Sequence, residues 1–255
     1  MSLNKFEKIF QDKQKKGKKA IMPFLPAGYP DKEKFWEYIR EMDQLGADII
    51  EIGVPFSDPV ADGPVVEEAS NIALKNGVNL KWIIDNLTEY RVFLDCEIVL
   101  MGYCNPFFKY GYEKLAKDMK NAGVSGIIIA DLPLEESIKI KPIFDAHDIS
   151  LIYLVGLNTS KERLEKYAKF ASGFVYFVSV LGTTGARDKL PEELKEKLKL
   201  ARDIFDLPIS IGFGIKSPSQ VKEIEPYIDG IVFGSSVIEH INKGKDIKDF
   251  FKAWI

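Results

Sequence analysis

The sequence has few of the residues from which disulfide frameworks and metal centres are built. Its 255 residues include two cysteines, Cys96 and Cys104, and two histidines, His147 and His240. Neither cysteine belongs to a CxxC pair, and the histidines stand far apart in segments with helical patterns, so we expect no metal centre. Two cysteines imply no disulfide framework, which favours a reducing compartment.

Long apolar runs and a strong charge imbalance are also missing. The longest apolar runs are far too short to cross a bilayer, and the first residues, MSLNKFEKIF, are charged and contain no signal-peptide core. A net charge of −3 and a sequence pI of about 5.6 argue against general polyanion binding. We interpret the lysines within residues 13–19 as a solvated helix end. The sequence therefore predicts a soluble cytoplasmic protein that binds neither nucleic acid nor membranes.

What the sequence does contain is a regular alternation of short apolar runs and amphipathic stretches. In residues 31–46, for example, Asp31 is a predicted N-cap and Gly46 a predicted C-terminal stop of a helix. The apolar runs are rich in Ile and Val and show little polar alternation, as parallel strands covered on both faces do. There are eight of them, at residues 20–25, 48–53, 97–103, 124–130, 150–156, 174–179, 207–212 and 229–234.

Eight strand–helix units without a linker predict a (β/α)₈ barrel, whose usual size is about 250 residues. We expect residues 1–255 to form a single barrel domain of the α/β class. An extra helix is predicted at the N-terminus (2–15), and two consecutive helices (65–76 and 80–94) follow the second strand. The alternative is a doubly wound open sheet, but AGYPD after the first strand is a poor match to its Gly-rich fingerprint.

The stretch EIGVPFSDPVADGP places acids around the end of the second strand. Strand alternation puts Glu51 on the face opposite Ile50 and Ile52, so Glu51 points into the barrel if those two meet the helices. Its position near the strand's C-terminal end is where barrel enzymes keep their active sites, and partial burial would raise its pKa towards neutrality. Asp58 and Asp62 follow on a proline-stiffened loop. The alternative for Glu51 is a structural ion pair, yet no Lys or Arg lies in any of the eight strands.

Three later loops on the same predicted face are rich in glycine and hydroxyl residues: LGTTGA (181–186), GFGIKS (212–217) and FGSS (233–236). Barrels often bind phosphate with the loops after strands seven and eight and with the N-terminus of a short helix. The candidate phosphate-binding residues are Gly185, Gly214, Gly234 and Ser235. The loop after strand six is either a mobile lid that excludes water or an ordinary flexible loop, and Thr184 and Gly185 are its first candidates for a role in the lid.

Several chemistries are excluded by what the strands lack. A Schiff-base aldolase needs an interior lysine, and none is present. A barrel glycosidase needs a second carboxylate across the sugar site, but strand seven ends in IGFG without an acid. Cofactor-free acid–base chemistry on a phosphorylated small molecule remains. Aromatic residues near the strand ends would suit a flat, apolar ring in that molecule, although each alone is more typical of core packing: Phe24, Tyr103, Tyr176 and Phe213.

These motifs resemble the tryptophan synthase α-subunit family over nearly the whole chain. The matching segments include PFLPAGYPD, GADIIEIGVPFSDPVADGP, MGYCNPFFKYG, GVSGIIIADLP, VSVLGTTGARD, GFGIKSP and DGIVFGSS, in the family's order and spacing. The resemblance implies a (β/α)₈ barrel that cleaves indole-3-glycerol phosphate to indole and glyceraldehyde 3-phosphate without a cofactor. It also implies that indole passes to a β subunit, which carries pyridoxal phosphate, in an α₂β₂ assembly.

The resemblance also assigns roles to individual residues. Glu51 matches the general acid/base, and Asp62 matches the acid that holds the indole N–H. Thr184 matches the lid residue that positions the second acid, and the aromatic residues named above match the pocket lining. Gly185, Gly214, Gly234 and Ser235 match the phosphate cradle. The surface that meets the β subunit is matched by Asp58, Asn105, Pro106 and Asp131.

Two other functions remain open at this point. One is a stand-alone lyase with the same active site and no partner. The other is a barrel that has lost catalysis and regulates its partner; the presence of both Glu51 and Asp62 counts against it.

Overall fold

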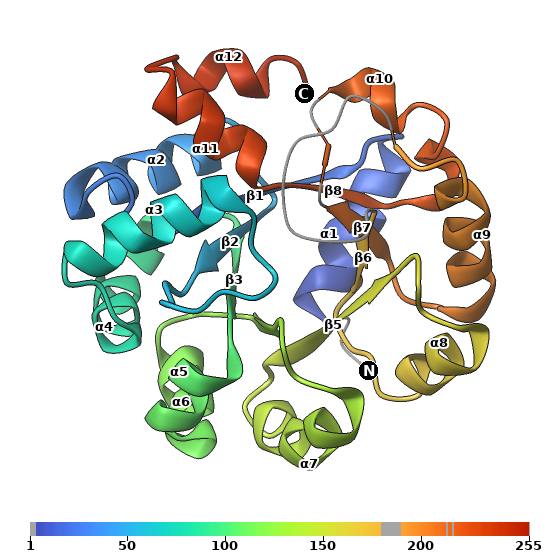
Figure 1. The fold of residues 1–255 in the computed structure, drawn as a ribbon, viewed down its shortest axis with the longest axis horizontal. Helices are drawn as coiled ribbons and strands as arrows, with labels where there is room; N and C mark the ends of the chain where they lie inside the picture. Colours follow the sequence, from blue (N-terminus) through green and yellow to red (C-terminus); the bar gives the residue numbers. More distant parts are fainter. Residues whose placement is uncertain (1–3, 180–189, 213, 216, 255) are drawn as a thin grey trace.

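A computed structural model describes residues 4–179, 190–212, 214–215 and 217–254 of the chain. Its strands form one closed, parallel barrel in sequence order, in which β8 pairs with β1 (Figure 1). Closure confirms the predicted barrel and excludes the doubly wound open sheet. Each predicted apolar run contributes one strand: β1 (Ala20–Pro26), β2 (Ile49–Gly53), β3 (Glu97–Gly102), β4 (Gly126–Ile129), β5 (Ser150–Gly156), β6 (Val175–Val178), β7 (Ile209–Gly212) and β8 (Gly230–Phe233).

Helices surround the barrel (Figure 1). The N-terminal helix and the two helices after β2 are present as predicted: α1 (Lys5–Lys15), α3 (Pro64–Lys75) and α4 (Leu80–Tyr90), the last followed by the 3₁₀ turn η1 (Arg91–Phe93). The others are α2 (Lys32–Gln44), α5 (Cys104–Tyr110), α6 (Tyr112–Asn121), α7 (Leu134–Asp145), α8 (Lys161–Ala168), α9 (Leu194–Ile204), α10 (Pro218–Val221), η2 (Glu225–Tyr227), α11 (Ser235–Asn242) and α12 (Ile247–Phe251). Within the described ranges, no helix is long and apolar enough to cross a membrane.

The ends of α2 show how the sequence sets the helix boundaries. The Asp31 side chain accepts hydrogen bonds from the backbone N–H groups of Glu33 and Lys34, at 3.0 and 2.8 Å. These bonds satisfy two of the donors that a helix leaves open at its N-terminus. At the other end Gly46 has a φ of 94°, a left-handed conformation that glycine adopts without steric cost. Both predicted boundary residues are thus confirmed.

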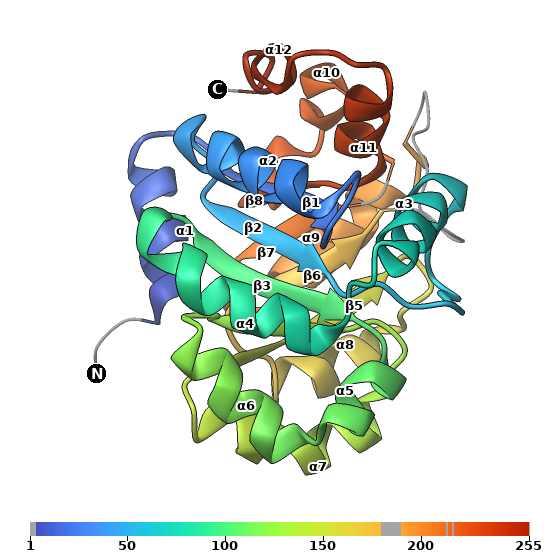
Figure 2. The ribbon, with the colours of Figure 1, turned by 90° about the vertical axis from the view of Figure 1, so that its left-hand side faces the viewer.

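Helix α1 covers the N-terminal end of the barrel. Figure 2 shows it at the end from which the strand arrows start, opposite the loop that joins β2 to α3. Its buried residues Phe6 and Phe10 pack on Phe174, with ring centroids 5.5 and 5.7 Å apart. A capping box between Asn4 and Glu7 starts the helix. This packing closes one end of the barrel and leaves the other for a site.

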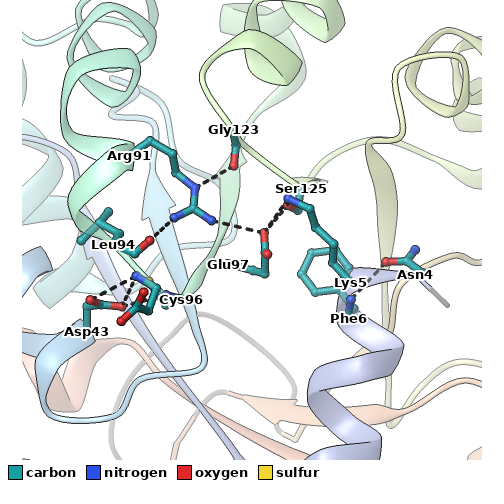
Figure 3. A network of polar contacts seen from close by, with 11 residues as sticks. Asn4, Lys5, Phe6, Asp43, Arg91, Leu94, Cys96, Glu97, Gly123 and Ser125 are labelled. Atoms are coloured by element: carbon teal, nitrogen blue, oxygen red, sulfur yellow. Dashed lines mark hydrogen bonds and ion pairs between the residues drawn. The ribbon is translucent and has the colours of Figure 1, made fainter. Parts of the chain in front are cut away.

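A polar network beside α1 ties together the segments that enter β3 and β4 (Figure 3). The Arg91 side chain donates to the Gly123 carbonyl oxygen at 3.1 Å and lies 3.6 Å from the Glu97 carboxylate. Glu97 also accepts from Lys5, at 3.2 Å, and from the Ser125 hydroxyl. The network lies at the N-terminal end of β3, whereas barrel active sites lie at the C-terminal ends of the strands. We therefore assign it a structural role.

Candidate active site

A pocket lies at the C-terminal ends of the strands, the location of active sites in barrels of this kind. It contains two carboxyl groups among mostly apolar side chains and a set of small residues. Its described lining consists of Phe24, Glu51, Asp62, Val66, Met101, Tyr176, Gly214, Ile215, Val232, Gly234 and Ser235.

Glu51 projects from β2 into this pocket. Its neighbours Ile50 and Ile52 are fully buried and, by strand alternation, face the helix layer. Glu51 is itself 0% exposed, and neither carboxyl oxygen has a hydrogen-bond partner among the described residues. Burial without a compensating partner penalises the charged form, so the pKa of Glu51 is raised well above its usual range. The protonated form, which this shift favours, can deliver a proton.

Asp62 reaches the same pocket from the loop between β2 and α3. The loop turns back on itself there, since the Asp62 N–H donates to the Pro59 carbonyl oxygen at 3.2 Å. Burial raises the pKa of Asp62 to about 6, while a hydrogen bond from Tyr103 acts in the opposite direction. Asp62 is therefore mostly ionised at neutral pH. The two carboxyl groups of one pocket thus favour different protonation states.

Tyr103, which follows β3, contacts the loop between β2 and α3. Its hydroxyl accepts the Ala61 N–H at 3.2 Å and donates to the Asp62 carboxylate. The side chain is buried and is not part of the described lining of the pocket. The ring packs on Phe56 of the same loop, with centroids 5.5 Å apart. The pocket-lining role that the resemblance implied for Tyr103 stays a prediction.

Tyr176, on β6, does line the pocket and is fully buried. Burial raises its pKa well above the usual range, and the nearby carboxyl groups of Glu51 and Asp62 add to the shift. The ring passes over Gly212 of the adjacent strand β7: a Cβ atom placed there would lie 2.2 Å from the Tyr176 hydroxyl oxygen. Glycine at this position gives the ring its space.

The opposite side of the pocket is built from backbone. Gly234 is the N-cap of α11 and Ser235 its first residue. The first N–H groups of a helix have no intrahelical partners and favour an anion. Gly214, with a φ of 76°, follows β7 and lies beside them in the lining. These three residues form a suitable place for a phosphate group.

Some predicted site residues cannot be placed. Thr184, Gly185 and Phe213 lie outside the described residues, as does most of the predicted lid. Conversely, sequence analysis missed apolar lining residues that the structure adds: Val66, Met101, Ile215 and Val232. Alternation could have found two of them, because Met101 and Val232 each lie on a strand two residues before its predicted end.

The residues predicted to meet a partner lie on segments that follow β2, β3 and β4. Asp58, Asn105 and Asp131 are exposed and Pro106 is half-buried. Asp131 accepts the Cys104 N–H at 2.7 Å and so fixes the start of α5. Sequence analysis missed two exposed apolar side chains in the same segments, Val60 and Phe108, which are 76% and 70% exposed.

Potential metal ligands do not gather anywhere in the part of the chain that the structure describes: no group of three or more His, Cys, Asp or Glu side chains could hold an ion. Both cysteines are free thiols. Burial raises the pKa of Cys104 to about 12, and the Asp131 carboxylate beside it adds to this rise, so the thiol is a poor nucleophile at neutral pH.

The closed barrel, with a pocket at its C-terminal face that contains two carboxyl groups, places the chain among the (β/α)₈-barrel proteins. A sequence model of the family described as tryptophan synthase alpha chain matches residues 10–252. The chain belongs to this family of lyases, which cleave indole-3-glycerol phosphate.

Relatives of known name agree. A tryptophan synthase alpha chain from Maridesulfovibrio salexigens is 51% identical over 254 residues, covering 100% of both chains. One from Solidesulfovibrio magneticus is 55% identical over 238 residues, or 93% of each chain. Among solved structures, tryptophan synthase from Mycobacterium tuberculosis has a TM-score of 0.89 at 30% identity, covering 99% of this chain and 96% of that one. The alpha chain from Legionella pneumophila has a TM-score of 0.86 at 30% identity, covering 99% and 95%.

Proposed function

We propose that this chain cleaves indole-3-glycerol phosphate by proton transfer between its own carboxyl groups and the substrate. The observation that carries the mechanism is Glu51, fully buried in the pocket with both oxygens unpartnered among the described residues. Such a group is costly for the fold, and a buried carboxyl with a raised pKa can both give and take a proton, as general acid–base catalysis requires. Retro-aldol cleavage of this substrate needs a proton donor and acceptor and calls for no cofactor on this chain.

The reaction proceeds in two proton transfers. Protonated Glu51 first gives its proton to C3 of the indole ring, and the ring nitrogen becomes positively charged. The Asp62 carboxylate accepts a hydrogen bond from that N–H and stabilises the charge. Ionised Glu51 then takes the proton of the neighbouring hydroxyl, a carbonyl forms, and the bond from C3 to the side chain breaks. Its electron pair restores the aromatic ring, and Glu51 ends protonated as it began.

The pocket accounts for the two ends of this substrate. Apolar residues such as Phe24 and Met101 suit the flat indole ring, while Gly214, Gly234 and Ser235 offer backbone N–H groups to the phosphate. The predicted contributions of Thr184, Gly185 and Phe213 to ring, lid and phosphate binding stay predictions.

Replacing Glu51 by glutamine tests the mechanism. Glutamine has the same size but cannot exchange the proton, so we expect indole formation to fall by at least about a hundredfold. Binding of glycerol 3-phosphate, measured by calorimetry, should stay within about twofold because the phosphate side is built from other residues. Full activity of Glu51→Gln would remove the proposed role of this residue.

We further propose that indole passes to a tryptophan synthase β chain carrying pyridoxal phosphate, in an α₂β₂ assembly. Asp58, Asn105, Pro106 and Asp131 would meet it. The exposed side chains of Val60 and Phe108 supply an apolar contact on the same segments, and exposed apolar residues rimmed by polar ones are typical of protein interfaces.

The proposed partnership is tested by mixing this chain with a tryptophan synthase β chain. We expect a β chain to co-elute with this chain on size exclusion and to raise its rate of cleavage. Phe108→Asp should weaken both effects. Phe93→Asp is the matched control, because Phe93 is also exposed but precedes β3 at the other end of the barrel. A wild-type chain that cleaves substrate at full rate and ignores the β chain would favour the stand-alone lyase.

We also infer that residues 1–255 act as one domain in the cytoplasm. The barrel takes its strands from Ala20 to Phe233, and helices at both ends of the chain bury side chains against it. The low cysteine content suits a reducing compartment.

A further inference from the structure

We propose that Tyr103 is the positioning residue of the active site: its hydroxyl holds the loop between β2 and α3 so that Asp62 points into the pocket. This inference rests on the proposed role of Asp62. It assigns Tyr103 a function other than lining the substrate pocket.

The contacts of the hydroxyl carry the proposal. The hydroxyl accepts the Ala61 N–H at 3.2 Å and also interacts with the carboxylate of the next residue, Asp62. Because the hydroxyl fixes the loop backbone at the residue directly before Asp62, it sets the place from which the Asp62 side chain enters the pocket.

Tyr103 is itself held rigidly. It is the N-cap residue of α5, and the next N–H, that of Cys104, donates to Asp131 at 2.7 Å. Its ring is 4% exposed and packs on Phe56, another residue of the loop. Helix α5 and the segment after β4 thus set the position of the hydroxyl, and the hydroxyl sets the position of Asp62.

The hydrogen bond also affects the protonation of Asp62. Burial alone favours the neutral acid, and the Tyr103 hydroxyl stabilises the carboxylate against it. Among the described residues, Glu67 acts in the opposite direction and raises the pKa of Asp62 further. Tyr103 therefore favours the ionised form of Asp62, which is the form that can accept the N–H of the substrate ring.

The variant Tyr103→Phe keeps the ring and its packing and removes only the hydroxyl. The control is Tyr110→Phe in the same helix, which also removes a tyrosine–aspartate hydrogen bond, from Tyr110 to Asp118 at 2.7 Å, away from the pocket. The first measurement is an NMR titration with ¹³C-labelled aspartate carboxyl groups, in which Asp62→Asn identifies the Asp62 signal. We expect Asp62 to titrate at about pH 6 in the wild type and Tyr110→Phe, and higher in Tyr103→Phe.

The second measurement is the pH dependence of indole formation. For Tyr103→Phe we expect kcat to fall by about tenfold to a hundredfold, the loss of one hydrogen bond to a charged group. The acidic limb of the profile should move to higher pH, while KM changes by less than about twofold because the phosphate side is untouched. If Tyr103 only stabilised the fold, Tyr103→Phe would lower the unfolding midpoint but would not move the acidic limb of the pH profile.

A third variant removes any dependence on the folding of Tyr103→Phe. Difluorotyrosine at position 103 keeps the ring and hydroxyl but makes the hydroxyl a stronger donor, so Asp62 should titrate at lower pH. An Asp62 titration that is the same in wild type, Tyr103→Phe and the fluorinated protein would overturn the inference. Failure of the wild type to cleave indole-3-glycerol phosphate would instead refute the proposed function, since the titrations do not depend on activity.

Discussion

The substitution Asp62→Asn is expected to make the free protein more stable while it slows the reaction. Asp62 is largely buried, and its pKa rises from 3.8 to about 6 on folding. In the unfolded chain the carboxyl ionises at lower pH than in the folded one, so ionisation favours unfolding as the pH rises between these values. At about 1.36 kcal/mol per pH unit, the shift corresponds to about 3 kcal/mol.

Asparagine carries no charge and can still accept the Tyr103 hydroxyl, so it escapes this cost. Urea unfolding of both proteins, followed by tryptophan fluorescence, should show no difference below about pH 4. The gain for Asp62→Asn should grow with pH and level off above about pH 6, near 3 kcal/mol. Asp58→Asn, an exposed acid on the same loop, is the control and should shift stability by less than about 0.5 kcal/mol. If the urea midpoint of Asp62→Asn at pH 8 is no higher than that of the wild type, burial of the charged carboxylate does not destabilise the protein and the reasoning fails.

Two further predictions concern shape and stability. Gly212→Ala would place a methyl group 2.2 Å from the Tyr176 hydroxyl oxygen, and the buried ring can yield only by moving. We expect kcat/KM for indole formation to fall by about a hundredfold, and an unchanged value would show that the ring position does not matter. Arg91→Met leaves the Gly123 carbonyl and Glu97 without their guanidinium partner (Figure 3). The free energy of unfolding measured in urea should therefore fall by about 1–3 kcal/mol. Arg163→Met is the control: it breaks an exposed ion pair with Glu135 and should leave the urea midpoint unchanged. If the two variants had the same midpoint, the structural role of the network would be contradicted.

The barrel could be predicted because its determinants are local. Each strand is a short Ile/Val-rich run, and each end of α2 is marked by a residue whose effect acts within a few positions, Asp31 and Gly46. Helix α5 could not be predicted in the same way. It has seven residues and no side-chain cap from its own segment; the Asp131 carboxylate, 27 residues along the chain, bonds its first N–H instead. Elements that depend on such distant contacts leave little trace in the local sequence.

The site was predictable in its chemistry and less so in its geometry. Glu51 stands out as a charged residue in an apolar strand, and glycines mark the phosphate side. Tyr103 gave no comparable signal: an aromatic residue after a strand suits a pocket wall as well as a support for a neighbouring loop. Only the hydroxyl contacts with Ala61 and Asp62 distinguish the two.

The difference between the two carboxyl groups follows from how each is held. Glu51 comes from a strand inside the barrel, where no described donor reaches it, so its neutral form is favoured. Asp62 comes from a loop, where Tyr103 donates to it and preserves its charge despite burial. Environments that push two pKa values apart allow one acid to transfer protons while the other stays ionised. Exchanging the two residue types would not exchange their roles, because the roles belong to the strand position and to the tyrosine behind the loop.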